Sequence, residues 1–353
     1  MAAVPSALSK AGSTYLAIDI GGTKTVLALY RATEEPDLPL AQKRFRSADF
    51  GGIEEIILDF LAAFDFRPES VILGIAGVAG ETRSRVTNLP WVITKSGLHD
   101  MGFTTVCMIN DMTALAASLP LLRGEEDILC LQEGSRSFSR AGEVTAVLAP
   151  GTGLGEGYLF KTGNGSVPRG TEGGHCAFGP DGDEQLKLLT WLAGTGHAGL
   201  SYETVCAGPA IGLLYEFYIS QGEEGDRQVR LELERATDKT PVVINAALSG
   251  TCSVCRKVVD LFLSILGREG ANLVLKVYAT DGLFLGGGIL PRLAGHVSFE
   301  PFLRSFRQEG PMAELLRSVP VNLILRRDAV LLGVASHGRD FLSKVRAHEP
   351  KIS

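Results

Sequence analysis

The chain has 353 residues, enough for two domains of ~100–200 residues each. Its 34 basic and 40 acidic side chains give a formal net charge of -6, which argues against nucleic acid as the main partner, because affinity for a polyanion comes largely from Lys and Arg. No apolar run reaches the roughly 18 residues of a membrane span, and six cysteines are too few for a disulfide scaffold. These features predict a globular protein of the cytoplasm without a membrane partner.

The first half of the chain is predicted to form a small α/β unit. Residues 1–14 are expected to be a disordered tail, and a glycine-rich turn then joins two apolar strands, as in a β-hairpin. Apolar side chains at helical spacing predict the first helix. The expected elements are strands at 15–20, 25–30 and 41–46, a helix at 52–64, strands at 71–76 and 106–109, and a helix at 112–119.

The second half repeats this beginning in outline. Its expected elements are a strand at 144–149, a glycine-rich turn at 150–157, a returning strand at 157–161, a hairpin turn at 162–166, helices at 183–192, 202–207, 210–221 and 242–278 (the last with breaks), strands at 282–285 and 321–325, and a helix at 329–345. The polar stretch 132–143 is interpreted as a surface loop. Two strand–turn–strand units, one in each half, predict two related α/β domains around a cleft.

Two glycine-rich turns carry the first chemical signal. They are Asp19-Ile-Gly-Gly-Thr-Lys24 and Gly151-Thr-Gly-Leu-Gly155. Backbone N–H groups in such turns converge on an anion, and a strand-end carboxylate such as Asp19 can hold a cation beside it. Each turn by itself is also compatible with a plain hairpin. One such turn in each half favours a site that holds a polyphosphate from both sides.

Three other motifs are interpreted as structural. Gly194-Thr-Gly-His-Ala-Gly199 has the spacing of a dinucleotide-binding turn, but it follows a predicted helix and not a strand. Cys252 and Cys255 lie in a helical pattern without a second Cys or His pair nearby, which favours core packing over a metal site. Asn164-Gly-Ser166 has the spacing of a glycosylation sequon and is interpreted as a turn.

Five polar residues are candidates for contacts with a hydroxylated ligand. Asn110 and Asp111 follow a strand and begin a helix, which is a common place for ligand contacts and equally a common place for a helix N-cap. Glu172 and His175, separated by two glycines, can accept from and donate to neighbouring hydroxyls. Glu203 begins a helix, where its own surroundings favour a first-turn acid beside the helix dipole.

Taken together, the motifs resemble the bacterial-type glucokinases of the hexokinase–actin–Hsp70 superfamily. Five patterns occur in the family's order between about Tyr15 and Leu342: Asp-x-Gly-Gly-Thr, Ile-Asn-Asp-x-Thr-Ala, Gly-Thr-Gly-Leu-Gly, Glu-Gly-Gly-His and Gly-Gly-Gly-Ile-x-Pro-Arg. The resemblance implies two RNase H-like (actin/hexokinase-type) α/β domains that flank an active-site cleft. It implies a small domain at 15–120 plus 328–353, and a large domain at 121–327.

The resemblance also implies an activity and a role for each matching residue. The activity is phosphorylation of the 6-hydroxyl of D-glucose by ATP with Mg²⁺, in a homodimer. Asp111 would be the catalytic base and Asp19 would lie near Mg²⁺. The sugar contacts would be Asn110, Asp111, Glu172, His175 and Glu203, so for Glu203 the resemblance outweighs the local interpretation. The nucleotide contacts would be Asp19, Ile20, Gly21, Gly22, Thr23, Gly151, Thr152, Gly153, Gly155, Gly286, Gly287, Gly288 and Ile289.

Two departures from the family pattern bear on this reading. Lys24 stands where the glucokinase branch usually has Asn, as in the related repressor–kinase (ROK) group, and its charge near the phosphates can alter the choice of donor. Cys176-Ala-Phe-Gly-Pro lacks the cysteine-rich zinc motif of that group, so no zinc is expected. The alternatives are a kinase for another hexose or an amino sugar, and a sugar-sensing regulator. A sugar-sensing regulator of this fold carries a helix-turn-helix before the first strand. The 14 residues that precede Tyr15 are too few for one, so the kinase is favoured over the regulator.

Overall fold

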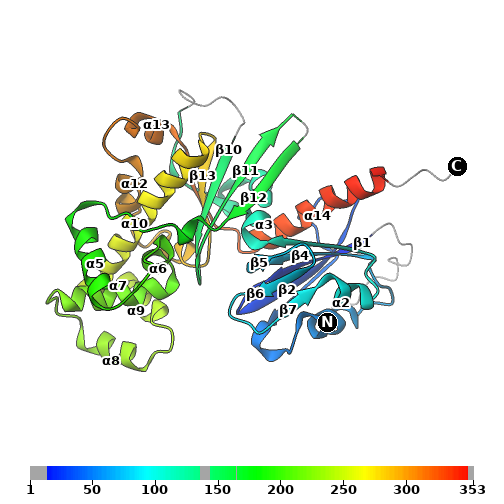
Figure 1. The fold of residues 1–353 in the computed structure, drawn as a ribbon, viewed down its shortest axis with the longest axis horizontal. Helices are drawn as coiled ribbons and strands as arrows, with labels where there is room; N and C mark the ends of the chain where they lie inside the picture. Colours follow the sequence, from blue (N-terminus) through cyan, green and yellow to red (C-terminus); the bar gives the residue numbers. More distant parts are fainter. Residues whose placement is uncertain (1–13, 136–143, 164, 349–353) are drawn as a thin grey trace. The chain divides into compact units, whose positions relative to one another are not determined.

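The structure is a computed structural model that describes residues 14–135, 144–163 and 165–348 (Figure 1). The chain divides into two compact units. Unit 1 comprises Met1–Leu122, Pro168–Gly170 and Arg327–Ser353, and unit 2 comprises Arg123–Val167 and Thr171–Arg326. The tail expected at 1–14 lies outside the described residues except for Thr14, which begins the first strand.

A five-stranded sheet of order β3-β2-β1-β4-β8 forms the centre of unit 1. Its strands are β1 (Thr14–Ile20), β2 (Lys24–Arg31), β3 (Ala41–Arg46), β4 (Ser70–Ile75) and β8 (Thr105–Asn110). β1, β4 and β8 run parallel, and their register aligns Ile20 with Ile75 and Ile75 with Asn110. Because parallel strands end at one edge of the sheet, the first glycine-rich turn and Asn110 lie along the same edge.

Helices cover both faces of this sheet, which explains why β1, β2 and β4 are buried almost throughout, whereas the edge strand β3 is mostly exposed. On one face α1 (Ile53–Leu61) buries Ile53, Ile56, Ile57, Phe60 and Leu61. On the other face α3 (Asp111–Ser118) packs on β4 and β8, and the C-terminal helix α14 (Ala329–His348) packs on β1 and β4. The two helices cross closely at Gly333, where a Cβ would collide with the carbonyl of Ala114. The C-terminal helix therefore completes the core of unit 1.

The rest of unit 1 was not indicated by the sequence. It contains a small antiparallel sheet of β5 (Gly77–Ala79), β6 (Arg83–Val86) and β7 (Val92–Thr94), followed by α2 (Lys95–Asp100). These strands have three or four residues each, too few for an alternating pattern to be visible.

Unit 2 contains a six-stranded sheet of order β12-β11-β10-β13-β14-β9. Its strands are β9 (Ile128–Gln132), β10 (Val144–Pro150), β11 (Leu154–Thr162), β12 (Gly165–Thr171), β13 (Gly282–Leu285) and β14 (Val321–Ile324). β10 pairs with β11 as far as Pro150 opposite Leu154. The turn expected at 150–157 is therefore only three residues long, and the returning strand begins at Leu154 and not at 157.

The core of unit 2 is built around one long helix, α10 (Ser253–Val277), which packs on α6, α7, α9, α12 and β10 (Figure 1). The helices of this unit are α4 (Gly124–Asp127), α5 (Gly182–Gly194), α6 (Tyr202–Cys206), α7 (Gly208–Ser220), α8 (Arg227–Arg235), α9 (Thr240–Leu248), α10, α11 (Leu290–Leu293), α12 (Glu300–Arg307) and α13 (Ala313–Ser318). The helix expected at 242–278 is two helices, because Gly250 adopts a positive φ and Cys252 caps α10.

Two further expectations are resolved by burial. Cys252 and Cys255 are both buried in the core, as their helical pattern predicted. Gln132 was expected in a surface loop, but it is the buried last residue of β9. Residues 136–143 and Asn164 of the predicted loop and turn lie outside the described residues.

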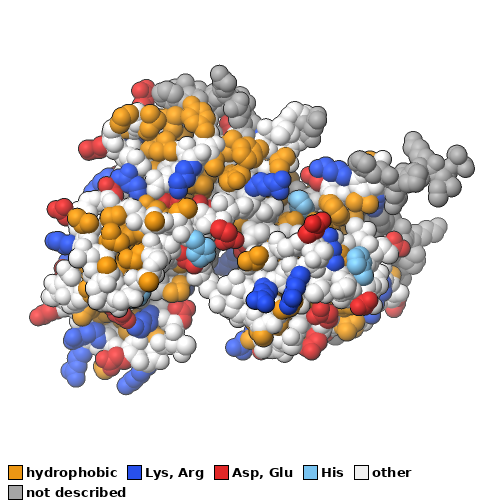
Figure 2. Space-filling view, in the orientation of Figure 1, with side chains coloured by type: hydrophobic (Ala, Val, Ile, Leu, Met, Phe, Trp, Pro, Cys, Tyr) orange, Lys and Arg blue, Asp and Glu red, His pale blue; other side chains and the backbone are white. Residues whose placement is uncertain are grey.

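Among the residues that the structure describes, no helix has both the length and the apolar content needed to cross a bilayer. On the face shown in Figure 2, basic and acidic side chains are interspersed.

Candidate active site

The first glycine-rich turn is a tight hairpin between β1 and β2. Gly21 N–H donates to the Lys24 carbonyl at 2.9 Å, which closes the turn. Ser47 holds it from behind, since its hydroxyl donates to the Gly21 carbonyl at 2.8 Å and its N–H donates to Thr23 at 3.1 Å. Ser47 is fully buried, and no sequence motif had indicated this supporting role.

Asp19 lies at the end of β1, beside this turn. Burial raises the pKa of its carboxyl group to about 7, an effect that Lys24 opposes and the charge of Asp111 reinforces. The influence of Asp111 shows that both carboxyl groups lie near the same sheet edge, as the register of β1, β4 and β8 requires. Carboxylate oxygens are the ligands that Mg²⁺ prefers, so the donor set at this edge fits a magnesium ion held with phosphate oxygens.

Asn110 is the N-cap of α3, one of the two roles that its position allowed. Its Oδ1 accepts from the N–H groups of Met112 at 2.8 Å and Thr113 at 3.3 Å, and its Nδ2 donates to the Gly77 carbonyl at 3.1 Å. The amide is thereby held in one orientation, with one N–H that has no partner among the described residues. Asp111 is the first residue of α3, and its Oδ1 accepts from Met112 at 3.0 Å.

In unit 2, the structure brings Glu172, His175 and Glu203 together. His175 lies between the two carboxylates, with its Nε2 at 3.9 Å from Glu172 Oε2 and its Nδ1 at 3.8 Å from Glu203 Oε1. All three side chains reach solvent, Glu203 the least at 33% exposed. The three therefore form a solvent-accessible set of donors and acceptors of the kind that recognises a polyol.

Glu203 also contacts the second glycine-rich turn. Its Oε2 accepts from the N–H of Leu154 at 2.9 Å, and a Cβ on Gly153 would collide with the same carboxylate. Its position in the first turn of α6, read alone, had suggested only an interaction with the helix dipole. The hydrogen bond joins this side chain to a turn that lies 49 residues earlier in the sequence.

The glycines of the second turn and of Gly286–Ile289 fall into two groups. Gly287 has a φ of +84° and lies against the Pro150 carbonyl, so the fold itself requires glycine there. Gly151 and Gly288 have nothing within 4 Å of the point where a Cβ would lie, so the packing does not require glycine at either position. Open backbone at these two positions fits the close approach of a phosphate or nucleoside.

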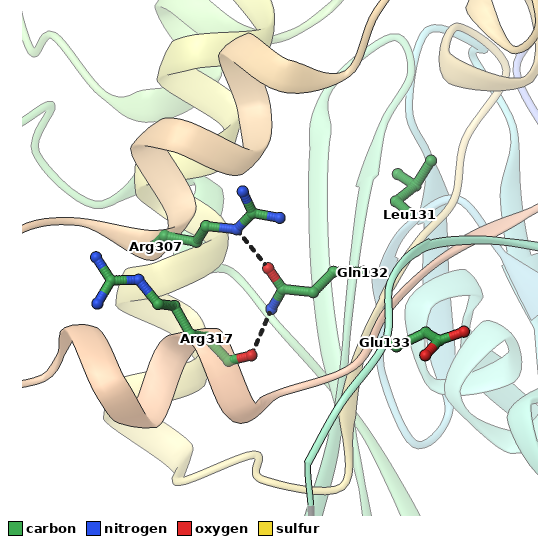
Figure 3. A pocket seen from close by; sticks show the side chains of 5 residues that line it. All are labelled: Leu131, Gln132, Glu133, Arg307 and Arg317. Atoms are coloured by element: carbon green, nitrogen blue, oxygen red, sulfur yellow. Dashed lines mark hydrogen bonds between the residues drawn. The ribbon is translucent and has the colours of Figure 1, made fainter.

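A hollow of about 440 Å³ in unit 2 is a different kind of feature (Figure 3). Gln132 lies in it and donates to the carbonyls of Leu316 at 3.0 Å and Val319 at 2.7 Å, at the end of α13. Arg307 Nε donates to Gln132 Oε1 at 2.7 Å, whereas the guanidinium of Arg317 points away from it (Figure 3). The side-chain amide of Gln132 is thus fully occupied by contacts within unit 2, and it fixes the end of α13.

The fold and these residues define the class of protein: a sugar kinase with the actin/hexokinase-type fold. The crystal structure of a glucokinase from an Antarctic psychrotroph matches with a TM-score of 0.78 at 29% identity, covering 93% of this chain and 99% of that one. The glucokinase of Balamuthia mandrillaris, solved in complex with glucose, matches in fold with a TM-score of 0.77 at 22% identity, covering 95% of this chain and 96% of that one.

The family model for glucokinase matches residues 16–340. The glucokinase of Synechocystis sp. is 32% identical over 349 residues, covering 92% of this chain and 97% of that protein. That of Nostoc sp. is 30% identical over 336 residues, covering 91% and 97%. The chain belongs to the glucokinase family. The resemblance that the five motifs indicated, and the fold class that it implied, are both confirmed.

Proposed function

We propose that this glucokinase transfers the γ-phosphoryl group of ATP to the 6-hydroxyl of D-glucose, with Asp111 as the general base. The observation that carries the proposal is the position of Asp111 at the start of α3, at the sheet edge where Asp19 and the first glycine-rich turn also lie. A base beside a phosphate-binding turn can accept the proton of an attacking hydroxyl. Phosphoryl transfer otherwise depends mainly on positioning and on stabilising charge.

The sugar ring is proposed to be held by four further side chains. Asn110 offers its remaining N–H, and Glu172, His175 and Glu203 offer a mixed set of donors and acceptors. Asn110 belongs to unit 1 and the other three residues belong to unit 2. In this reading the units correspond to a small domain at 15–120 plus 328–353 and a large domain at 121–327.

The nucleotide is proposed to be held by backbone groups of three segments, 19–23, 151–155 and 286–289. Asp19 would hold Mg²⁺, which supplies positive charge to the phosphate oxygens. The open backbone at Gly151 and Gly288 supports this assignment. Lys24, on β2 next to the first turn, adds a cation there and is proposed to influence the choice of phosphoryl donor.

The proposed location is the cytoplasm, and the proposed assembly is a homodimer, which light scattering on the purified protein measures directly.

The second candidate substrate class is another hexose or an amino sugar. An assay of ADP release across a panel of sugars, with ATP as the donor, distinguishes glucose from these other substrates. N-acetylglucosamine and fructose are expected to be much poorer substrates than glucose, because groups that a bound sugar covers and that are matched to its hydroxyls penalise an analogue that lacks or blocks one. Comparable kcat/KM values for N-acetylglucosamine would point to an amino-sugar kinase.

The variant Asp111→Asn tests the mechanism. It removes the proton acceptor and keeps nearly the same shape, so kcat should fall at least ~100-fold, a change of about 2.7 kcal/mol in the barrier. Glucose affinity, measured by equilibrium titration, should change far less because the other four contacts remain. Since Asn110 supplies the cap of α3, the substitution at Asp111 should leave folding intact. A folded Asp111→Asn protein that keeps most of its kcat would show that Asp111 is not the base.

A further inference from the structure

Two glutamates are buried side by side beneath the elements that carry Glu172, His175 and Glu203. Glu156 of β11 is 2% exposed and Glu269 of α10 is fully buried. The charge of Glu269 acts directly on Glu156, and one buried oxygen of each carboxyl group, Glu156 Oε1 and Glu269 Oε1, has no hydrogen-bond partner among the described residues. Because an ionised carboxylate only accepts hydrogen bonds, a bond between two of them requires that one carries a proton.

The surroundings identify Glu156 as the member that carries the proton. Glu269 has a cation and an amide donor beside it, since Lys276 Nζ lies 3.6 Å from its Oε1 and Asn272 Nδ2 donates to its Oε2 at 2.9 Å. Burial, followed by the charge of Glu269 and the hydrogen bond to it, raises the pKa of Glu156 to about 8, with only partial opposition from Lys276. Because neither Glu156 Oε1 nor Glu269 Oε1 has a hydrogen-bond partner among the described residues, a proton between the two carboxyl groups would satisfy both.

The pair contacts the sugar-binding elements from behind. A Cβ on Gly173 would collide with Glu156 Oε2, so the backbone of the short turn Gly173–His175 packs directly on this carboxyl group. On the other side, Asn272 Nδ2 donates both to Glu269 and to the hydroxyl of Tyr202 at 2.9 Å. Tyr202 immediately precedes Glu203 at the start of α6.

We propose that Glu156 and Glu269 are positioning residues that share one proton, and that this proton keeps the Glu172–His175 turn and Glu203 in the arrangement that binds the sugar. This inference rests on the proposed role of those residues as glucose contacts. Loss of the proton would place two negative charges side by side away from water, and their repulsion would push Glu156 against the backbone of Gly173.

Three other groups interact electrostatically with the pair. They are Lys276 on α10 and Tyr202 and Cys206 on α6. Burial raises the pKa of the Tyr202 hydroxyl and of the Cys206 thiol above values that are already alkaline, so both stay neutral near pH 8. The expected event near that pH is therefore ionisation of Glu156.

The test is the pH dependence of glucose KM and kcat in the full-length enzyme, from about pH 6.5 to about pH 9.5. If only the protonated pair is competent to bind, about a tenth of the protein remains competent one pH unit above the pKa, so the wild-type glucose KM should rise roughly tenfold by about pH 9. The value of kcat at saturating glucose should change much less. In Glu156→Gln the neutral amide can donate to Glu269 permanently, and the alkaline rise in KM should disappear.

Glu232→Gln, on the exposed face of α8, is the matched control and should keep the wild-type profile. Glu269→Gln also removes the paired charges, so it should abolish the rise even if Glu156→Gln fails to fold. Equilibrium titration of the wild-type protein with glucose provides the same test without any variant. A flat glucose Kd between about pH 7 and about pH 9, or an alkaline rise that persists in Glu156→Gln, would overturn the proposal. Absence of glucose phosphorylation at every pH would instead refute the proposed substrate.

Discussion

Asn110 illustrates how one side chain can serve both the fold and a binding site. Its Oδ1 caps α3, and its Nδ2 is anchored on the Gly77 carbonyl, so the amide cannot rotate without losing three hydrogen bonds. A donor held in this way is already oriented before a ligand arrives, which reduces the entropy lost on binding. The cap and ligand interpretations of this position are therefore compatible.

Two substitutions at Asn110 should separate these roles. Asn110→Ser keeps a good N-cap and loses the amide, so stability should change little while the glucose KM rises. Asn110→Ala loses the cap as well and should lower the free energy of unfolding by about 1–2 kcal/mol. Urea unfolding measures the stability, and steady-state kinetics at saturating ATP measures KM. Equal stability losses in both variants would contradict the cap, and an unchanged glucose KM in both would exclude Asn110 from the sugar site.

The glycine-rich segments show why similar motifs have different physical requirements. Gly287 is required by its positive φ and by its contact with Pro150, whereas Gly288 has open space where its side chain would be. Sequence alone cannot distinguish these neighbours, because both belong to the same Gly-Gly-Gly run. The distinction depends on how β10 and β13 are paired.

This difference gives a matched pair of variants. Gly287→Ala forces a left-handed backbone on a residue with a Cβ and should lower the free energy of unfolding by at least ~1–2 kcal/mol. Gly288→Ala should leave thermal unfolding nearly unchanged and raise the KM for ATP, because the added methyl group would occupy the space proposed for the nucleotide. An ATP KM that stays at the wild-type value in Gly288→Ala would remove this segment from the nucleotide site.

The proposed sugar contacts belong to both units. Bound glucose should therefore stabilise the folded protein through contacts in each of them. A ligand present at about 100 times its Kd stabilises the folded protein by about 2.7 kcal/mol, and each tenfold loss of affinity reduces this by up to about 1.4 kcal/mol. We expect both Asn110→Ser, in unit 1, and His175→Asn, in unit 2, to reduce the stabilisation by glucose. Thermal unfolding with and without a fixed glucose concentration measures it. An undiminished glucose-induced shift in His175→Asn would exclude His175 from sugar binding.

The buried glutamates also affect stability as a function of pH. The folded state raises the pKa of Glu156 from 4.5 to about 8, so between these values the folded protein retains a proton that the unfolded chain releases. The contribution of Glu156 to the free energy of unfolding must therefore decrease as pH rises through this window and level off above it. Glu156→Gln lacks this penalty and should gain stability relative to wild type by on the order of a few kcal/mol as pH rises. Urea unfolding of both proteins at about pH 5 and at about pH 8 measures the difference between their free energies of unfolding. This difference should be larger at the higher pH, and an unchanged difference would contradict the prediction.

Several elements of this protein could be predicted from the sequence because they depend on local residue patterns. The hairpins at Asp19 and Gly151, the amphipathic helix α1 and the Glu172–His175 turn depend on residues adjacent in sequence, so their patterns are visible without a structure. The family resemblance was also visible in the sequence, because it depends on the order and spacing of five motifs along the chain. Strands of three or four residues, such as β5, β6 and β7, have too few side chains for such a pattern.

The remaining features depend on contacts between distant segments, which no local pattern encodes. Glu203 reaches Leu154 across 49 residues, and Ser47 supports a turn that lies 26 residues before it. Glu156 is a charged residue between two glycines in the buried half of β11, and this local signal becomes interpretable only when α10 places Glu269 beside it. Burial and partner identity set the energies of such polar groups, and both arise only once the chain has packed.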